Sequence, residues 1–117
     1  MRRTIVCLCG STKFKDAFIE ANFRETMKGH IVLSVGFFRH TDEVRSCTEE
    51  EKKMLDALHF DKIELADEVL VLNVGGYIGE STQSELDYAI EHGKNIRYLE
   101  AQNEKAADNL GIPKGNE

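Results

Sequence analysis

Short apolar runs alternate with longer amphipathic segments, and this alternation constrains the fold more than any other feature of the chain. β-branched residues are frequent in the apolar runs, as in strands that are buried on both faces. The predicted strands cover residues 4–9, 30–35, 68–74 and 95–99, and the predicted helices cover 14–27, 48–66 and 82–92. Such alternation predicts an α/β fold: a small doubly wound, flavodoxin- or Rossmann-like parallel sheet of about four strands with helices on both faces.

The length of 117 residues fits one domain. We expect residues 1–100 to form a single α/β domain, because the predicted strands and helices all fall there. The remaining residues, 101–117, are polar and contain Pro113 and Gly115, which predicts a partly disordered C-terminal tail.

The charge balance excludes some partners. With 15 Lys and Arg against 21 Asp and Glu, the net charge is −6, which argues against a nucleic-acid polymer or an anionic membrane as partner. A small anionic ligand held by local groups stays compatible with this charge. No run approaches the ~20 apolar residues that a membrane-spanning helix needs.

The cysteines suggest a reduced, cytoplasmic protein. Cys7 and Cys9 lie two apart in a predicted strand and share one of its faces, whereas Cys47 is distant in sequence. No C-x-x-C pair and no cluster of His and Cys is seen along the chain, so we expect free buried thiols and no metal site. We expect structural or surface roles for His59 within a helix and for His30 and His92.

In parallel α/β sheets, ligands bind at the carboxyl ends of the strands. The loops of interest are therefore 10–13, 36–47 and 73–85. In the first loop, Gly10, Ser11 and Thr12 could cradle a phosphate or oxyanion at a helix N-terminus, or Ser11 or Thr12 could merely cap the helix. In the second, Phe38 could stack on a base and His40 could contact a ligand, or the phenylalanine could belong to the core or an interface.

The third loop is rich in glycine. Gly75, Gly76 and Gly79 flank Tyr77 and would allow close approach of the backbone to a ligand, although a turn without function explains them too. Tyr77 could contact that ligand or close the loop. The spacing from Thr82 to Glu85 fits a capping box, but a glutamate at this helix start could equally face a ligand at the sheet edge.

Three segments stand out: residues 66–72, the glycine-rich loop, and Ser84-Glu85-Leu-Asp-Tyr-Ala89 leading to Gly93-Lys94. Together they resemble the nucleoside 2-deoxyribosyltransferase superfamily, which includes nucleoside 5′-monophosphate N-glycosidases. The most specific part is the pattern Glu-x-x-x-Ala-x-x-x-Gly-Lys, and the likeness runs from Gly10 to about Leu99. The resemblance implies that Glu85 is the catalytic glutamate and that Gly10 and Ser11 bind phosphate.

The implied activity is cleavage or transfer of the N-glycosidic bond of a nucleoside or its 5′-monophosphate through a glutamate nucleophile. By this resemblance Ser11 and either Ser81 or Thr82 hold the sugar or phosphate, and Asn73 touches the substrate. Asn73 stands where deoxyribosyltransferases have an acidic group, so the proton donor is open among Asp42, Glu43 and Glu80. No metal or organic cofactor is needed.

Two other functions stay open. The same pocket could sense a nucleotide without turnover, as a non-catalytic binding module. The segment from Gly75 to Glu85 also partly matches the Gly-Gly-x-Gly-Thr-x-x-Glu motif of lysine-decarboxylase-like phosphoribohydrolases. Because so small a sheet leaves one face or edge thinly covered, we expect a homodimer or larger homo-oligomer.

Overall fold

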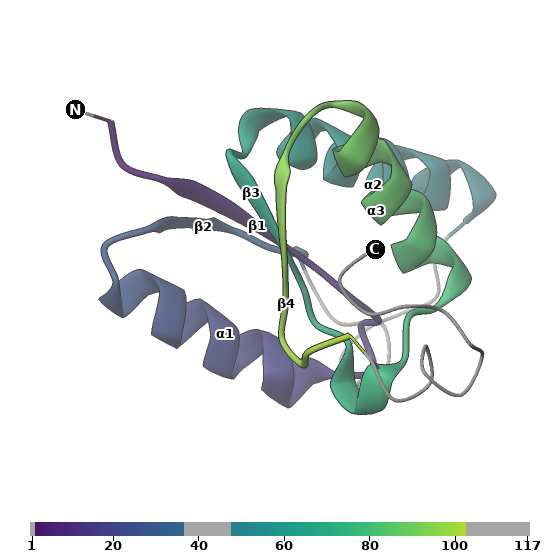
Figure 1. Ribbon diagram of the computed structural model, residues 1–117. Coiled ribbons are helices and arrows are strands. Elements are labelled where there is room, and N and C mark those ends of the chain that lie inside the picture. Colours follow the sequence, from purple (N-terminus) through teal and green to yellow (C-terminus); the bar gives the residue numbers. More distant parts are fainter. Residues whose placement is uncertain (1, 37–47, 103–117) are drawn as a thin grey trace, which may run out of the picture.

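The computed structural model describes residues 2–36 and 48–102, which form a four-stranded parallel sheet with helices on both faces (Figure 1). In chain order the elements are β1 (Ile5–Cys9), α1 (Lys15–Met27), β2 (Ile31–Leu33), α2 (Glu49–Leu65), β3 (Glu68–Val71), the 3-10 turn η1 (Val74–Gly76), α3 (Glu80–Glu91) and β4 (Asn95–Tyr98). The predicted α/β fold is confirmed. The expected roles of Phe38, His40, Asp42, Glu43 and Cys47, and most of the predicted tail, lie outside the described residues.

The order of the strands places a ligand site between the two central ones. The sheet runs β2-β1-β3-β4, with every neighbouring pair parallel. From β1 the chain crosses to β2 on one side, and from there it returns past β1 to β3 on the other. The carboxyl ends of β1 and β3 therefore flank the switch in strand order, where open α/β sheets bind ligands.

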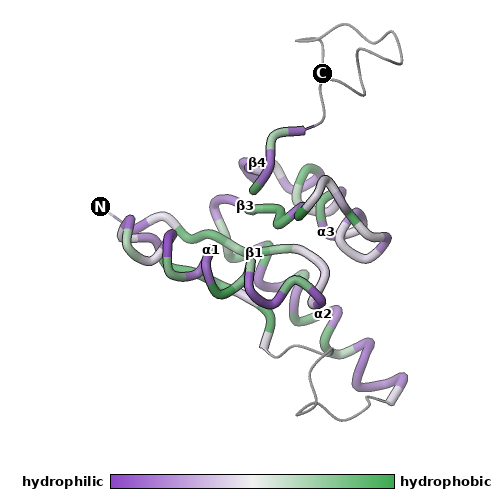
Figure 2. Tube along the Cα trace, turned by 90° about the horizontal axis from the view of Figure 1, so that it is seen from below, coloured by the Kyte–Doolittle hydropathy of each residue, from purple (hydrophilic) through white to green (hydrophobic). Residues whose placement is uncertain are grey.

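Alternation along β1 divides the core into two layers. Val6 and Leu8 pack with Phe18 of α1 on one face, whereas Cys7 and Cys9 face the layer that α2 and α3 cover. Seen from below, the strands lie between α1 and α3, with hydrophobic stretches toward the middle and hydrophilic residues in the first turns of α2 (Figure 2). In the described part of the chain, no helix is long and apolar enough to cross a membrane.

Helix α2 begins as the sequence predicts, and few of its apolar side chains are buried. The Thr48 hydroxyl accepts from the Glu51 N–H at 3.0 Å, and the Glu51 carboxylate accepts from the Thr48 N–H at 2.9 Å, which completes a capping box. Along the helix His59 and Ile63 are buried, so they lie on the face turned to the sheet. Three large apolar residues of the helix are instead exposed: Met54, Leu58 and Leu65.

The starts of α1 and α3 correct two expectations. Helix α3 begins at Glu80, with Gly79 as N-cap, and the buried Thr82 lies inside the helix, so the predicted capping box between Thr82 and Glu85 is wrong. The extended backbone of Gly79 lets its carbonyl accept from the Gln83 N–H at 2.8 Å, which starts the helix early. Capping of α1 by Ser11 or Thr12 is also wrong, because the N-cap is Phe14 and no side chain caps it.

A buried carboxylate lies near the C-terminal end of α1. Glu25 is 1 % exposed, and it accepts from Arg97 at 2.7 Å, from His30 at 2.9 Å and from Lys28 at 3.2 Å. Burial acts to raise the pKa of Glu25, but the hydrogen bonds from Arg97, His30 and Lys28 outweigh it and lower the pKa to about 2. Glu25 thus ties α1 to β4 across the sheet.

Candidate functional site

A cavity of about 560 Å³ lies at the carboxyl ends of the strands, within the range typical of small-molecule sites. It is bounded by the connections that follow β1, β2 and β3 and by one face of α2. The lining residues are Gly10, Ser11, Thr12, Val35, Gly36, Lys52, Leu55, Asp56, Leu58, His59, Lys62, Tyr77, Gly79, Glu80, Ser81, Thr82 and Glu85. The structure therefore brings together eight of the residues that the sequence proposed for the site: Gly10, Ser11, Thr12, Tyr77, Gly79, Ser81, Thr82 and Glu85.

Gly10 lets the first loop pack against the end of β3. A Cβ atom at this position would lie 3.0 Å from the Leu72 Cβ and 3.2 Å from the Leu72 carbonyl oxygen, closer than ordinary van der Waals contact. The loop then turns so that the Phe14 N–H donates to the Ser11 carbonyl at 3.0 Å. This close packing places Ser11 and Thr12 on the wall of the cavity.

Tyr77 joins the first loop to the glycine-rich loop. The Lys13 ammonium lies 4.1 Å from the centre of the Tyr77 ring, and Phe14 meets the same ring edge-on. A Cβ atom at Gly79 would approach the Tyr77 hydroxyl to 2.9 Å, so a side chain there would displace the tyrosine. The ring is about half exposed and lines the cavity.

Asn73 does not line the cavity, contrary to its expected place beside the substrate. Its side-chain amide donates to the Glu100 carbonyl at 2.9 Å, and its side-chain oxygen accepts from the Glu100 N–H at 2.9 Å. The Glu100 carboxylate in turn accepts from the Gly75 N–H at 2.9 Å. Asn73 thus fixes the segment after β4, and Gly75 and Gly76 form a turn outside the cavity wall, with positive φ angles of 64° and 84°.

Glu85 is the carboxylate most enclosed by the cavity. It lies in the second turn of α3, on the side turned toward α2, and its side chain is 17 % exposed. Its Oε1 atom is buried and accepts no hydrogen bond, and no other buried side-chain oxygen or nitrogen in the described part of the chain lacks a partner. The His59 Nε2 lies 3.7 Å from this oxygen. Burial raises the pKa of Glu85, and the neighbouring His59 opposes this shift in part.

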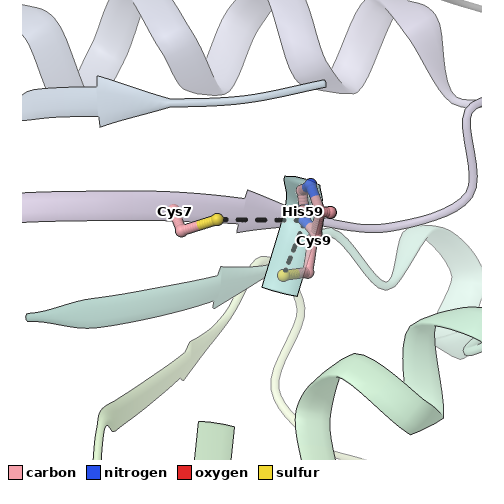
Figure 3. A group of neighbouring side chains, drawn as sticks. All are labelled: Cys7, Cys9 and His59. Atoms are coloured by element: carbon pink, nitrogen blue, oxygen red, sulfur yellow. Dashed lines mark hydrogen bonds between the residues drawn. The ribbon is translucent and has the colours of Figure 1, made fainter. Parts of the chain in front are cut away.

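Beneath Glu85, His59 meets the two cysteines of β1 (Figure 3). The His59 Nε2 lies 3.3 Å from the Cys9 Sγ and 3.8 Å from the Cys7 Sγ, and all three residues are buried. The Cys9 thiol and His59 lower the pKa of Cys7 to about 6, whereas Cys7 and burial raise the pKa of Cys9. Burial acts to lower the pKa of His59, but the Cys7 thiol and Glu85 outweigh it and raise the pKa.

This cluster corrects two expectations. Cys7 and Cys9 are free buried thiols, as predicted, but a cluster of His and Cys does exist in space, and His59 belongs to the site rather than the surface. A signal for His59 was present in the sequence. Leu55, His59 and Ile63 are spaced by four residues, which places a histidine on the inner stripe of α2.

Comparisons with known proteins show which solved structures share this fold. No protein-family model and no curated protein matches the chain. Among solved structures, the chain is similar to the 2-deoxyribosyltransferase of Bacillus psychrosaccharolyticus, with a TM-score of 0.64 and 18 % identity over 90 % of this chain and 81 % of that one. The chain shares its fold. The sequence resemblance to the nucleoside 2-deoxyribosyltransferase superfamily is thereby confirmed at the level of the fold.

A second structure gives the same result. The CMP N-glycosidase of Clostridium botulinum matches with a TM-score of 0.55 and 16 % identity, over 92 % of this chain and 98 % of that one. The chain therefore shares the fold of this enzyme over the aligned region.

Proposed function

We propose that this chain is an enzyme that cleaves or transfers the N-glycosidic bond of a nucleoside or nucleoside 5′-monophosphate, with Glu85 as nucleophile. The observation that carries the proposal is the Glu85 carboxylate, which lines the cavity with a buried oxygen that has no hydrogen-bond partner. A structural carboxylate in the interior normally has both oxygens hydrogen-bonded, so one with a free oxygen in a cavity is a candidate for chemistry. Two proteins of the same fold are named for reactions at such bonds.

The chemistry needs a carboxylate in such a place. One Glu85 oxygen attacks the anomeric carbon while the bond to the base breaks and its electron pair leaves with the base. Positive charge that develops on the sugar is stabilised by the same carboxylate. Water then attacks the glycosyl-enzyme in hydrolysis, or a second base attacks it in transfer, and Glu85 is released as a carboxylate.

The other walls of the cavity suit the rest of a nucleotide. Ser11 and Thr12 offer hydroxyl groups, and Ser81 offers another at the first turn of α3, where the helix dipole favours a phosphate or sugar oxygen. Tyr77 offers an aromatic face for stacking on a base. This chemistry uses no metal and no organic cofactor.

The departing base also needs a proton. Of the three carboxylates that the sequence left open as donors, Asp42 and Glu43 lie outside the described residues, and Glu80 lines the cavity. We therefore propose Glu80 as the donor. Replacement of Glu80 by Gln should slow the release of poor leaving bases more than the release of good ones.

Chromatographic detection of free base tests the proposed function. Wild type, Glu85→Gln and Glu91→Gln are incubated with ribo- and deoxyribonucleosides and their 5′-monophosphates, with and without an acceptor base. Glu91 is the matched control, an exposed glutamate on the same helix outside the cavity. We expect base release or exchange by wild type and Glu91→Gln alone.

Folded wild type that binds a nucleotide but releases no base under any of these conditions would contradict the proposal and favour a sensing module. Circular dichroism of each variant confirms the fold. The expected homo-oligomer is tested separately, by size-exclusion chromatography with light scattering.

A further inference from the structure

Three side chains converge below the cavity on the face of the sheet that α2 covers (Figure 3). The Cys7 Sγ, the Cys9 Sγ and the His59 Nε2 all lie within 4.8 Å of one another, and all three residues are buried. Two sulfurs and an imidazole nitrogen are the ligand types that zinc and related divalent transition metals prefer.

The distances between these atoms match a tetrahedral metal centre. Metal–sulfur bonds of about 2.3 Å and metal–nitrogen bonds of about 2.05 Å separate a sulfur from a nitrogen by about 3.5 Å at the tetrahedral angle. The observed separations from the His59 Nε2 are 3.3 Å to the Cys9 Sγ and 3.8 Å to the Cys7 Sγ. The two sulfurs lie within 4.8 Å of one another, against about 3.8 Å on a tetrahedral metal, so a metal ion fits between the three atoms with side-chain shifts of up to about 1 Å.

The backbone holds the two sulfurs in register. Strand β1 lies in the middle of the sheet, where Cys7 pairs with Leu33 of β2 and with Val69 of β3. Because Cys7 and Cys9 are two residues apart in this strand, both side chains leave it on the same face. His59 meets them from α2, so the three donors come from two rigid elements.

Glu85 lies beside this group of three and offers a fourth donor when its side chain moves toward the sulfurs. Its Oε1 lies 3.7 Å from the His59 Nε2, close to the roughly 3.4 Å that separates a nitrogen and an oxygen ligand on a tetrahedral metal. The same oxygen is buried and has no hydrogen-bond partner. A bound metal would satisfy it.

We propose that Cys7, Cys9, His59 and Glu85 form a binding site for one divalent, thiolate-preferring transition metal ion, for which zinc is the best fit. Both His59 and Glu85 line the cavity, so the ion reaches the sulfurs from that side. On binding, the ion displaces any protons that the two thiols carry.

The site has a consequence for the reaction, and this consequence rests on the proposed function. A metal ion bound to Glu85 withdraws negative charge from the carboxylate and holds it toward the sulfurs, which weakens it as a nucleophile toward a sugar. Zinc should therefore inhibit base release, and a chelator should restore it.

Metal binding is measured without any substrate, so its result is independent of the proposed function. Cys47→Ser serves as the reference protein, because it leaves Cys7 and Cys9 as its cysteines. Zn²⁺ is titrated in competition with a chromophoric chelator, and Co²⁺ is added to the same protein as a spectroscopic probe. We expect one Zn²⁺ per chain with a dissociation constant below about 1 μM.

We expect Co²⁺ to give a thiolate-to-metal charge-transfer band and the strong visible bands of a tetrahedral centre. In the same background Cys7→Ser, Cys9→Ser and His59→Gln should each weaken Zn²⁺ binding at least about 100-fold. Glu85→Gln should weaken it about 10-fold, and the control His92→Gln, at an exposed histidine, should leave it unchanged.

Binding of Zn²⁺ by the reference protein that is no tighter than by the Cys7→Ser, Cys9→Ser double variant would overturn the site. So would a cobalt spectrum of the folded reference protein without the charge-transfer band, a result that does not depend on any change to the proposed ligands. Tight binding without inhibition of an active enzyme would leave the three-residue site in place and overturn the part assigned to Glu85.

Discussion

Two glutamates, the buried Glu25 and the partly buried Glu85, lie on opposite faces of the sheet, and their surroundings differ. Glu25, on the inner face of α1, accepts hydrogen bonds from Arg97, His30 and Lys28, and its pKa is lowered to about 2. Glu85, on the side of α3 that faces α2, has one buried oxygen without a hydrogen-bond partner and a raised pKa. A carboxylate that holds a fold together is satisfied by its neighbours, whereas one that acts on a ligand leaves a lone pair free.

The largest expected effect is on turnover. Glu85→Gln keeps the shape of the side chain but removes the nucleophile, so base release should fall at least about 10³-fold. Chromatography of the released base measures the rate, and Glu25→Gln should retain wild-type turnover per folded molecule. Equal losses in the two variants would break the distinction between the glutamates.

The next largest effect is on stability, and it concerns Glu25 rather than Glu85. Glu25→Gln leaves Arg97, His30 and Lys28 without their shared anion, and we expect the free energy of unfolding to fall by about 3 kcal/mol. Urea unfolding at neutral pH measures this. Glu20→Gln on the exposed face of the same helix is the matched control, with an expected change within about 0.5 kcal/mol.

Glu25 should also make stability depend on pH. Its pKa is about 2 in the folded chain against an ordinary value of 4.5, so its stabilisation is complete above pH 4.5 and is lost as the pH falls toward 2. The shift corresponds to about 3 kcal/mol. Urea unfolding of wild type and Glu25→Gln at pH 7 and pH 3 tests this, and the difference between the two proteins should shrink at pH 3.

The smallest expected effect is that of Glu85→Gln on stability, and it distinguishes Glu85 from Glu25. Because the Glu85 carboxylate is buried without full pairing, Glu85→Gln should leave the free energy of unfolding unchanged or raise it by up to about 1 kcal/mol. Thermal unfolding in the presence of a chelator measures this at neutral pH. A loss of 2 kcal/mol or more would indicate that Glu85 is a structural residue like Glu25.

The sequence predicted the fold because its signals are local. Strands β1 and β2 are continuous apolar runs, β3 is one after its first residue, and Thr48 with Glu51 marks the start of α2. These patterns predict the sheet without knowledge of which helix covers which face. The resemblance to a known superfamily singled out Glu85, which the structure places in the cavity.

The site was harder to predict, because it depends on contacts between distant segments. Cys7 and Cys9 share a face by alternation, but only the fold shows that His59 covers that face. Asn73 follows a strand that ends at the site, yet its amide bonds to the backbone of Glu100 instead. No spacing in the sequence shows where that amide bonds.

Charged residues on the buried faces of helices are a sequence signal for both glutamates. Glu25 is buried together with Phe18 and Ala21 at helical spacing, and Glu85 lies three residues from the buried Thr82 and four from the buried Ala89. Charged residues on the inner stripe of a helix are therefore worth noting in any chain of this kind. Such a residue alone does not reveal whether its partners are protein groups or a ligand.

Mass spectrometry of the protein quenched during turnover tests the role of Glu85 most directly, with the substrate that the base-release assay identifies. A nucleophilic mechanism predicts a protein heavier by one sugar unit, with the added mass on the peptide that contains Glu85. Glu85→Gln should show no such species. Sustained turnover by Glu85→Gln, or a sugar attached to a different residue, would contradict the assignment.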